Sequence, residues 1–171
     1  MKSLILTLLL STQIFAFINN LNSFEANFIQ TITDDKNKVL TYNGTLLASK
    51  PQNALWNYTS PVKKSIYMNK FNIIIIEPEI EQAIIRKITS DFDFFKIIKN
   101  AKKIDANNFI AQFENTSFTI KTKNNLIESI TYVDQFENNV KILFSDQQQN
   151  KDIDKKIFIP IIPSDFDIIR D

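Results

Sequence analysis

The chain has 171 residues, enough for one domain with a substantial core, and its formal charge of +1 gives no electrostatic footprint for nucleic acid. It contains no cysteine and no histidine. This composition excludes disulfide bonds, thiolate metal sites and cysteine nucleophiles, and it removes the usual general base and zinc ligand.

The N-terminus has the layout of a cleavable secretory signal. Lys2 precedes an apolar run from Leu4 to Leu10, and the segment ending at Ala16 closes on a small residue. The run is too short to span a bilayer as a mature helix, although a buried N-terminal helix is an alternative. We therefore predict a signal peptide over 1–16 and a single domain over 17–171. With no cysteine to carry a lipid, the mature chain is expected to be soluble and unanchored.

From Phe24 onward, apolar residues recur with a period of two, which predicts β-strands. In the first strand Gln30 is the one polar residue on the apolar face. Gly44, the only glycine, lies inside the second strand and indicates a bulge, a close approach of another backbone, or a simple bend. Further strands are expected at about 64–69, 72–77 and 79–88, and then near 109–113, 118–120, 127–133 and 140–144. Short strands between polar turns predict an antiparallel sheet, sandwich or barrel.

Two segments depart from this pattern. Residues 90–91 offer an N-cap, and Phe94, Ile97 and Ile98 then fall on one helical stripe. Such a helix must cover an apolar surface; the pattern alone favours ordinary packing on a sheet, and the functional alternative is a lid over a cavity. The proline-containing end, 158–163, cannot be a central strand and is expected to be an edge segment or a terminal wrap.

The residues suggest no enzyme. Glu77, Glu79 and Glu81 would lie on one face of a strand, where paired carboxylates can act as acid and base. They alternate with apolar residues, so a solvated face is the better interpretation. The sequence has no phosphate-binding glycine loop and no calcium loop, and we expect no metal site and no cofactor.

Several motifs, taken in order, resemble one family. They are an F-x-A-x-F-x-Q pattern from Phe24 to Gln30, Gly44-x-Leu46 leading to Lys50-Pro51, Trp56-x-Tyr58, Pro61, and Ile80-Glu81-Gln82 after Pro78. Their order and spacing resemble the periplasmic outer-membrane lipoprotein carrier family, LolA, most closely over 23–88.

The resemblance implies a fold that is mainly β with helices: an incomplete, strongly curved antiparallel β-barrel covered by a helical lid. It implies a periplasmic chaperone that binds the acyl chains of triacylated lipoproteins and carries them to the outer membrane. The implied partners are the inner-membrane lipoprotein-releasing ABC transporter and an outer-membrane lipoprotein receptor. That receptor is itself a lipoprotein, and this chain has no cysteine to lipidate, so the soluble carrier, as a monomer, is the better match.

The resemblance also gives candidate site residues. The family places an arginine just before the proline, where it bonds to the lid and keeps it shut; here the position is Lys50. Strand parity puts Lys50 on the side of Leu46, from which its ammonium would reach lid carbonyls, although a solvated turn residue is the alternative. The candidate cavity-lining residues are Phe28, Leu46, Trp56, Tyr58, Ile74, Ile76, Ile80 and Ile84, with Phe94, Ile97 and Ile98 closing the cavity from the lid. Ordinary core packing is the alternative for each of them.

Two other functions stay open at this point. One is a periplasmic binding module for another hydrophobic ligand. The other is an envelope-stress sensor domain that recognises lipoproteins.

Overall fold

Nearly all regular structure in the described part of the chain belongs to one sheet. The computed structural model describes residues 20–88 and 93–170. The strands are β1 (Ser23–Thr33), β2 (Val39–Ser49), β3 (Asn53–Ser60), β4 (Lys64–Met68), β5 (Asn72–Glu77), β6 (Gln82–Lys87), β7 (Lys102–Lys103), β8 (Asn108–Phe113), β9 (Thr116–Lys123), β10 (Leu126–Val133), β11 (Asn139–Gln149) and β12 (Asp167–Arg170). The helical elements are α2 (Phe94–Lys99) and two 3₁₀ turns, η1 (Pro78–Ile80) and η2 (Lys155–Phe158).

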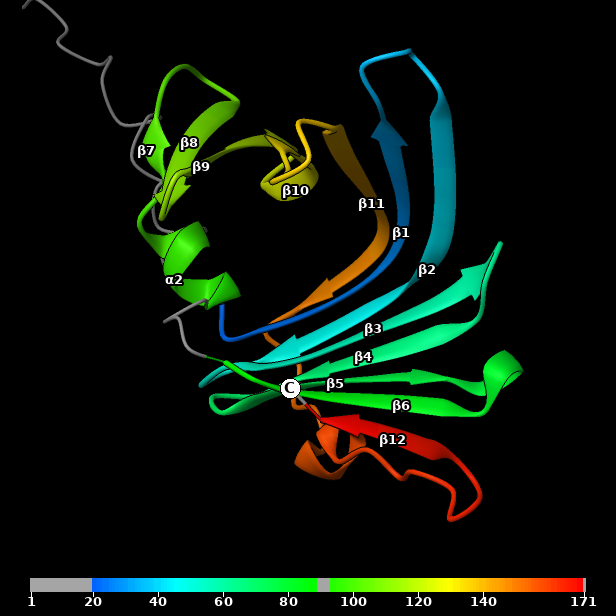
Figure 1. The fold of residues 1–171 in the computed structure, drawn as a ribbon. Helices are drawn as coiled ribbons and strands as arrows, with labels where there is room; N and C mark the ends of the chain where they lie inside the picture. The colour runs from blue at the N-terminus through cyan, green and yellow to red at the C-terminus, as the bar shows by residue number, and fades with distance from the viewer. Residues whose placement is uncertain (1–19, 89–92, 171) are drawn as a thin grey trace, which may run out of the picture.

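The sheet bends round without closing. Its order is β12-β6-β5-β4-β3-β2-β1-β11-β10-β9-β8-β7, so β12 and β7 lie at its two ends. All neighbouring strands are antiparallel except β12, which joins β6 in parallel. Figure 1 shows the two halves of the sheet facing each other across its concave side, with α2 near the gap between them. The predicted mainly β, incomplete barrel is confirmed, with β12 as a parallel exception.

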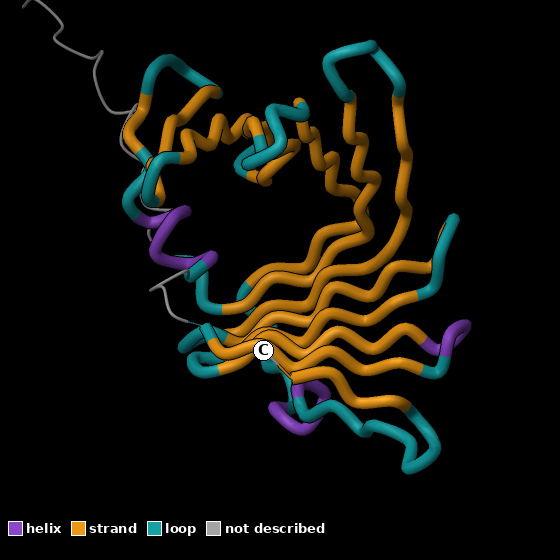
Figure 2. The backbone as a smooth tube through the Cα atoms, in the orientation of Figure 1, coloured by secondary structure: helices purple, strands orange, loops and turns teal. Residues whose placement is uncertain are grey.

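Breaks in register help to bend the long strands. They occur between Glu25 and Asn27 where β1 meets β11, between Asn43 and Gly44 where β2 meets β3, and between Ile127 and Ser129 where β10 meets β9. An irregularity of this kind bends a strand and increases its local twist. The backbone tube in Figure 2 shows the long central strands changing direction along their length. The curvature thus comes from the strands themselves.

The largest apolar side chains gather on the concave face. Phe24, Phe28, Leu46, Ile98 and Ile120 are almost completely buried in one cluster. Phe28 packs edge-on against both Trp56 and Tyr58, with ring centroids 5.1 and 5.0 Å apart. Each such aromatic pair contributes about 0.5–1.5 kcal/mol beyond the area it buries.

The C-terminal segment wraps the convex face, as the prolines predicted. η2 contacts β3, and Figure 1 shows it below the sheet, on the side away from α2. Phe158 in η2 is buried, and so are Leu55, Ile76 and Ala83, which lie outside the main cluster. The chain then returns to the sheet as β12.

The helical part is smaller than predicted. Only one α-helix, of six residues, is present in the described ranges, so a lid of several helices is not seen. Asp93 is its N-cap and accepts hydrogen bonds from the backbone N–H groups of Phe95 (2.9 Å) and Lys96 (3.3 Å). The expected cap at 90–91 and the predicted signal peptide over 1–16 lie outside the described residues.

The predicted strand over 79–88 is also shorter. Pro78 starts η1, and Glu81 adopts a left-handed conformation with φ of 52° before β6 begins at Gln82. Proline cannot donate to a sheet ladder, so the strand pattern ends there. Glu77, Glu79 and Glu81 therefore do not share one strand face.

Gly44 is required because there is no space for a side chain. A Cβ atom at this position would collide with the carbonyl oxygen of Asn57 and would lie 2.7 Å from Cζ of Phe28. A break in register lies beside Gly44, between Asn43 and Gly44. Of the predicted alternatives, the close approach of another backbone is confirmed by the Asn57 carbonyl oxygen.

We expect Gly44→Ala to destabilise the fold, by roughly 1–3 kcal/mol, because overpacking forces backbone and ring to shift. Urea unfolding measures the change. Thr45→Ala, at the neighbouring half-buried position, is the matched control and should change the free energy of unfolding much less. Equal stability of Gly44→Ala and the wild type would show that Phe28 can give way.

Candidate binding cavity

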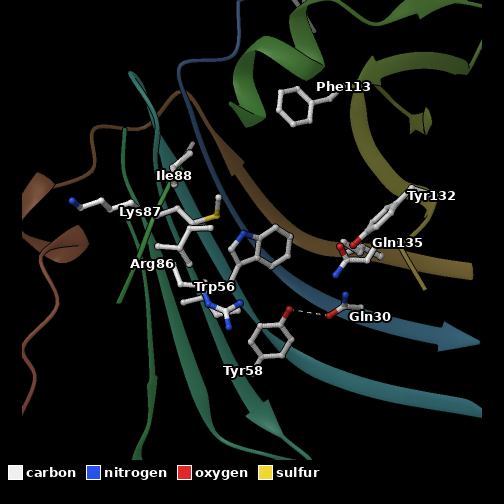
Figure 3. Close-up of a pocket in the computed structure, with 13 residues that line it drawn as sticks. Gln30, Trp56, Tyr58, Arg86, Lys87, Ile88, Phe113, Tyr132 and Gln135 are labelled. Carbon is white, nitrogen blue, oxygen red and sulfur yellow. Dashed lines mark hydrogen bonds between the residues drawn. The ribbon is translucent and has the colours of Figure 1, made fainter. Parts of the chain in front are cut away.

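The concave face forms an open cavity of about 710 Å³. Its lining residues come from both halves of the sheet, as Figure 3 shows. They are Gln30, Trp56, Tyr58, Ile66, Met68, Ile73, Arg86, Lys87, Ile88, Phe113, Tyr132, Gln135 and Ile142. Most are apolar or aromatic, and the volume is in the range of pockets that hold small organic ligands.

A second, smaller cavity of about 200 Å³ lies against α2. It is lined by Trp56, Phe94, Ile97, Ile98, Phe118, Ile120, Ile130, Tyr132 and Ile142. No charged residue lines it, and it shares Trp56, Tyr132 and Ile142 with the larger cavity. A third space of about 40 Å³, lined by Leu46, Trp56 and Phe95 among others, adjoins both. Trp56 therefore stands where all three meet.

The structure brings several of the predicted lining residues together. Trp56 and Tyr58 line the large cavity, and Leu46 lines the smallest one. Phe28 is buried behind the rings of Trp56 and Tyr58. Ile84 shares the concave face with Trp56, because the ladder pairs Trp56 with Ile66, Ile66 with Ile75, and Ile75 with Ile84.

Three predicted lining residues point elsewhere. Ile74 pairs with Tyr67 and Ile76 with Ser65, which places both on the convex face. Ile73 lines the cavity instead. Four consecutive isoleucines have no alternation, so only the pairing of β5 with β4 decides which of them face inward. Ile80, in η1, is 63% exposed and lies outside all of these cavities.

The three residues assigned to the lid lie on α2 and line the smaller cavity. Ile97 and Ile98 are buried, and the ring of Phe94 lies 5.7 Å from that of Phe24. Lys96 and Lys99 on the opposite side are exposed. This short helix thus presents its apolar stripe to the cavity.

Lys50 lies beyond the end of β2, so the strand-parity argument for it is wrong. It is exposed in the turn between β2 and β3. Its Nζ donates to Oδ1 of Asn22 (3.0 Å) and lies 5.9 Å from the ring centroid of Phe95 on α2. The ammonium therefore contacts α2 at the aromatic ring of Phe95. A cation–π contact of this kind contributes about 0.5–1 kcal/mol at an exposed site.

Six of the thirteen residues that line the large cavity carry a charged group, an amide or a hydroxyl, namely Gln30, Tyr58, Arg86, Lys87, Tyr132 and Gln135. The Tyr58 hydroxyl donates to Oε1 of Gln30 (2.9 Å), which accounts for the polar exception on the apolar face of β1. Burial raises the pKa of Tyr58, so its phenol stays neutral, with smaller effects from Tyr132 and Tyr42. Nζ of Lys64 lies 4.7 Å from the centre of the Tyr58 ring.

The lining residues of the C-terminal half are absent from the sequence prediction. Phe113, Phe118, Ile130, Tyr132 and Ile142 supply one wall of the cavities. The alternation of apolar residues in their strands was visible in the sequence. Their position in the cavity wall depends on the pairing of β1 with β11, two strands that lie far apart in the sequence. That pairing leaves no local sequence signal.

The described residues show neither a metal-binding cluster nor a membrane-spanning helix. No cluster of three or more acidic residues there is arranged to hold a metal ion. No helix there has the length and hydropathy needed to cross a membrane.

Comparisons with known proteins identify the family of this chain. The family model described as outer membrane lipoprotein carrier protein LolA matches residues 19–160. The outer-membrane lipoprotein carrier protein of Campylobacter jejuni is 37% identical over 169 residues, covering 99% of each chain. That of Helicobacter pylori is 37% identical over 155 residues, covering 90% of this chain and 83% of the other.

Two solved structures have a similar fold. A LolA superfamily protein from Nitrosomonas europaea aligns with a TM-score of 0.53 at 13% identity, covering 90% of this chain and 99% of that one. An uncharacterized conserved protein from Thermus thermophilus aligns with a TM-score of 0.56 at 8% identity, covering 93% and 98%. The match to the family model over most of the chain and the full-length identity to curated carriers show that the chain belongs to the outer membrane lipoprotein carrier protein family, LolA.

Proposed function

We propose that this chain shields the acyl chains of lipoproteins while it carries them through the periplasm to the outer membrane. The observation that carries the proposal is the apolar cavity of about 710 Å³ on the concave face, adjoined by the apolar space against α2. No bond is made or broken in this process. The carrier supplies only a surrounding that replaces water.

The energetic demand explains why a cavity is needed. Moving one buried methylene group into water costs about 0.8 kcal/mol, so three long acyl chains would cost tens of kcal/mol. The lining is rich in aliphatic side chains, including Met68, Ile66 and Ile73. Met68, with its unbranched side chain, can adapt to a mobile hydrocarbon chain without strict shape complementarity.

Displacement of α2 would let the ligand enter and leave. Its contacts with the core come from a few apolar side chains: Phe95, Ile97 and Ile98 are buried, and Phe94 packs against the core. A ligand in the smaller cavity would exchange these contacts for its own. In this proposal Lys50, close to the Phe95 ring, helps to hold α2 in the empty state.

The family and the sequence support the remaining features of the proposed role. The chain would be exported by the N-terminal signal over 1–16 and would act as a monomer in the periplasm. It would receive lipoproteins from the inner-membrane lipoprotein-releasing ABC transporter and deliver them to an outer-membrane receptor.

Depletion of the protein tests the cellular role. Lipoproteins that normally reach the outer membrane should accumulate at the inner membrane when the protein is depleted. Fractionation of the two membranes measures this distribution. Unchanged sorting after depletion would exclude the carrier role.

Phe94→Asp tests the cavity and the place of α2. A carboxylate among these apolar side chains is costly, so affinity for a fluorescent acyl probe should fall by at least about tenfold. Lys96→Asp, on the exposed side of the same helix, is the matched control and should bind like the wild type. If Phe94→Asp is folded and binds normally, the lid assignment is wrong.

Lys50→Ala tests the latch. Loss of the contact with Phe95 should speed association of the acyl probe by about two- to fivefold, as expected for a contact of about 0.5–1 kcal/mol. Stopped-flow fluorescence measures the rate. Lys50→Arg should keep the wild-type rate, and Lys63→Ala, at an exposed lysine of the β3–β4 turn, is the control. Identical rates for Lys50→Ala and Lys63→Ala would rule out a latch.

A further inference from the structure

Gln30 holds an amide nitrogen ready for a ligand in the wall of the large cavity. The residue is only 9% exposed and lines the cavity. Its oxygen accepts the Tyr58 hydroxyl, whereas its nitrogen forms no hydrogen bond with any protein group in the described ranges. Figure 3 shows the oxygen turned toward Tyr58 and the nitrogen turned away from it. This nitrogen is not among the fully buried, unpaired side-chain atoms of the described residues, so a ligand or water in the cavity can accept its hydrogens.

The orientation of the Gln30 amide is fixed by Tyr58 and the rings that pack around it. The Tyr58 ring is held edge-on by Phe28 and by Tyr42, at centroid distances of 5.0 and 5.7 Å. The ammonium of Lys64 lies 4.7 Å from the same ring. Because Tyr58 is held on these sides, its hydroxyl keeps the oxygen of Gln30 in place. The amide nitrogen is thereby kept available to the cavity.

The charges of the lining suit a ligand that only accepts hydrogen bonds. Arg86 and Lys87 are the charged residues among the thirteen that line the cavity, and neither aspartate nor glutamate is among them. Hydrocarbon chains alone need no donor. An ester carbonyl has two lone pairs and no hydrogen to donate, so it can accept a hydrogen bond from the Gln30 amide.

We propose that Gln30, held by Tyr58, donates from Nε2 to an ester carbonyl oxygen of a diacylglyceryl group, and so lets the cavity distinguish ester-linked acyl chains from plain hydrocarbon. This inference rests on the proposed carrier function and adds the recognised chemical group. Diacylglyceryl esters occur in lipoproteins and in phospholipids, and the hydrogen bond would be the same in both. Tyr58 is a positioning residue in this arrangement.

The test compares two synthetic probes. One is a fluorescent triacylated lipopeptide with two glyceryl esters, and the other is its dialkyl ether analogue, in which methylene groups replace the ester carbonyls. The wild type should bind the ester probe about fivefold more tightly. Gln30→Leu should bring this ratio close to one while affinity for the ether probe stays within about twofold.

Further variants separate this role from general damage to the fold. Tyr58→Phe frees the amide to rotate and should lower the ratio by about half, with the ether affinity retained. Gln112→Leu, on the exposed side of β8, is the matched control and should keep the wild-type ratio. Circular dichroism checks that every variant is folded.

The outcomes are distinct. Equal binding of ester and ether probes by the wild type, or an unchanged ratio in Gln30→Leu, would overturn this inference and leave the carrier function standing. Failure of the wild type to bind either probe would overturn both. Dipalmitoylphosphatidylglycerol and its diether analogue then identify the source of the ester. Tighter binding of the lipopeptide assigns the subsite to lipoproteins, and equal affinity assigns it to diacylglycerides in general.

Discussion

The ring of Phe28 rests on Gly44, and the inner surface of the sheet is organised around this contact. Without a side chain on Gly44, Phe28 can lie flat enough to support Trp56 and Tyr58 from behind. Trp56 then lines all three cavities, and Tyr58 orients Gln30. A well-packed aromatic base therefore holds the side chains that line the cavities. The rings of Trp56 and Tyr58 thus join the packed core to the cavity.

An apolar space of this size has an energetic consequence. A hydrophobic ligand in this space would gain dispersion contacts with the lining and would itself be removed from water, so binding and stability are linked. The small number of side chains by which α2 meets this space keeps the exchange between helix and ligand modest. Such a balance suits a protein that must both bind and release.

The sequence was informative where local alternation determines structure. In β2 and β3 the period of two placed Leu46, Trp56 and Tyr58 on the correct face. The same alternation gave the wrong face in β5, because consecutive isoleucines can face inward in either register. It was also wrong at Ile80, because Pro78 interrupts the strand. The wall from β8 to β11 could not be assigned, because its position depends on contacts such as Phe28 with Phe144, which are far apart in the chain. The sequence shows Gln30 as a polar exception on the apolar face of β1. That Tyr58 is its hydrogen-bond partner depends on the three-dimensional fold.

The two ends of the open sheet bear on the behaviour of the protein in a crowded compartment. A sheet that does not close leaves unpaired backbone groups along its outermost strands, and these can recruit strands from other molecules. At one end the last strand is β7, only two residues long and made of two exposed lysines. At the other, β12 covers the edge of β6 and is itself four residues long, with a charged residue at each end. Short, charged borders of this kind discourage fibril-like association, so the fold can keep its hollow interior open without becoming a template for aggregation.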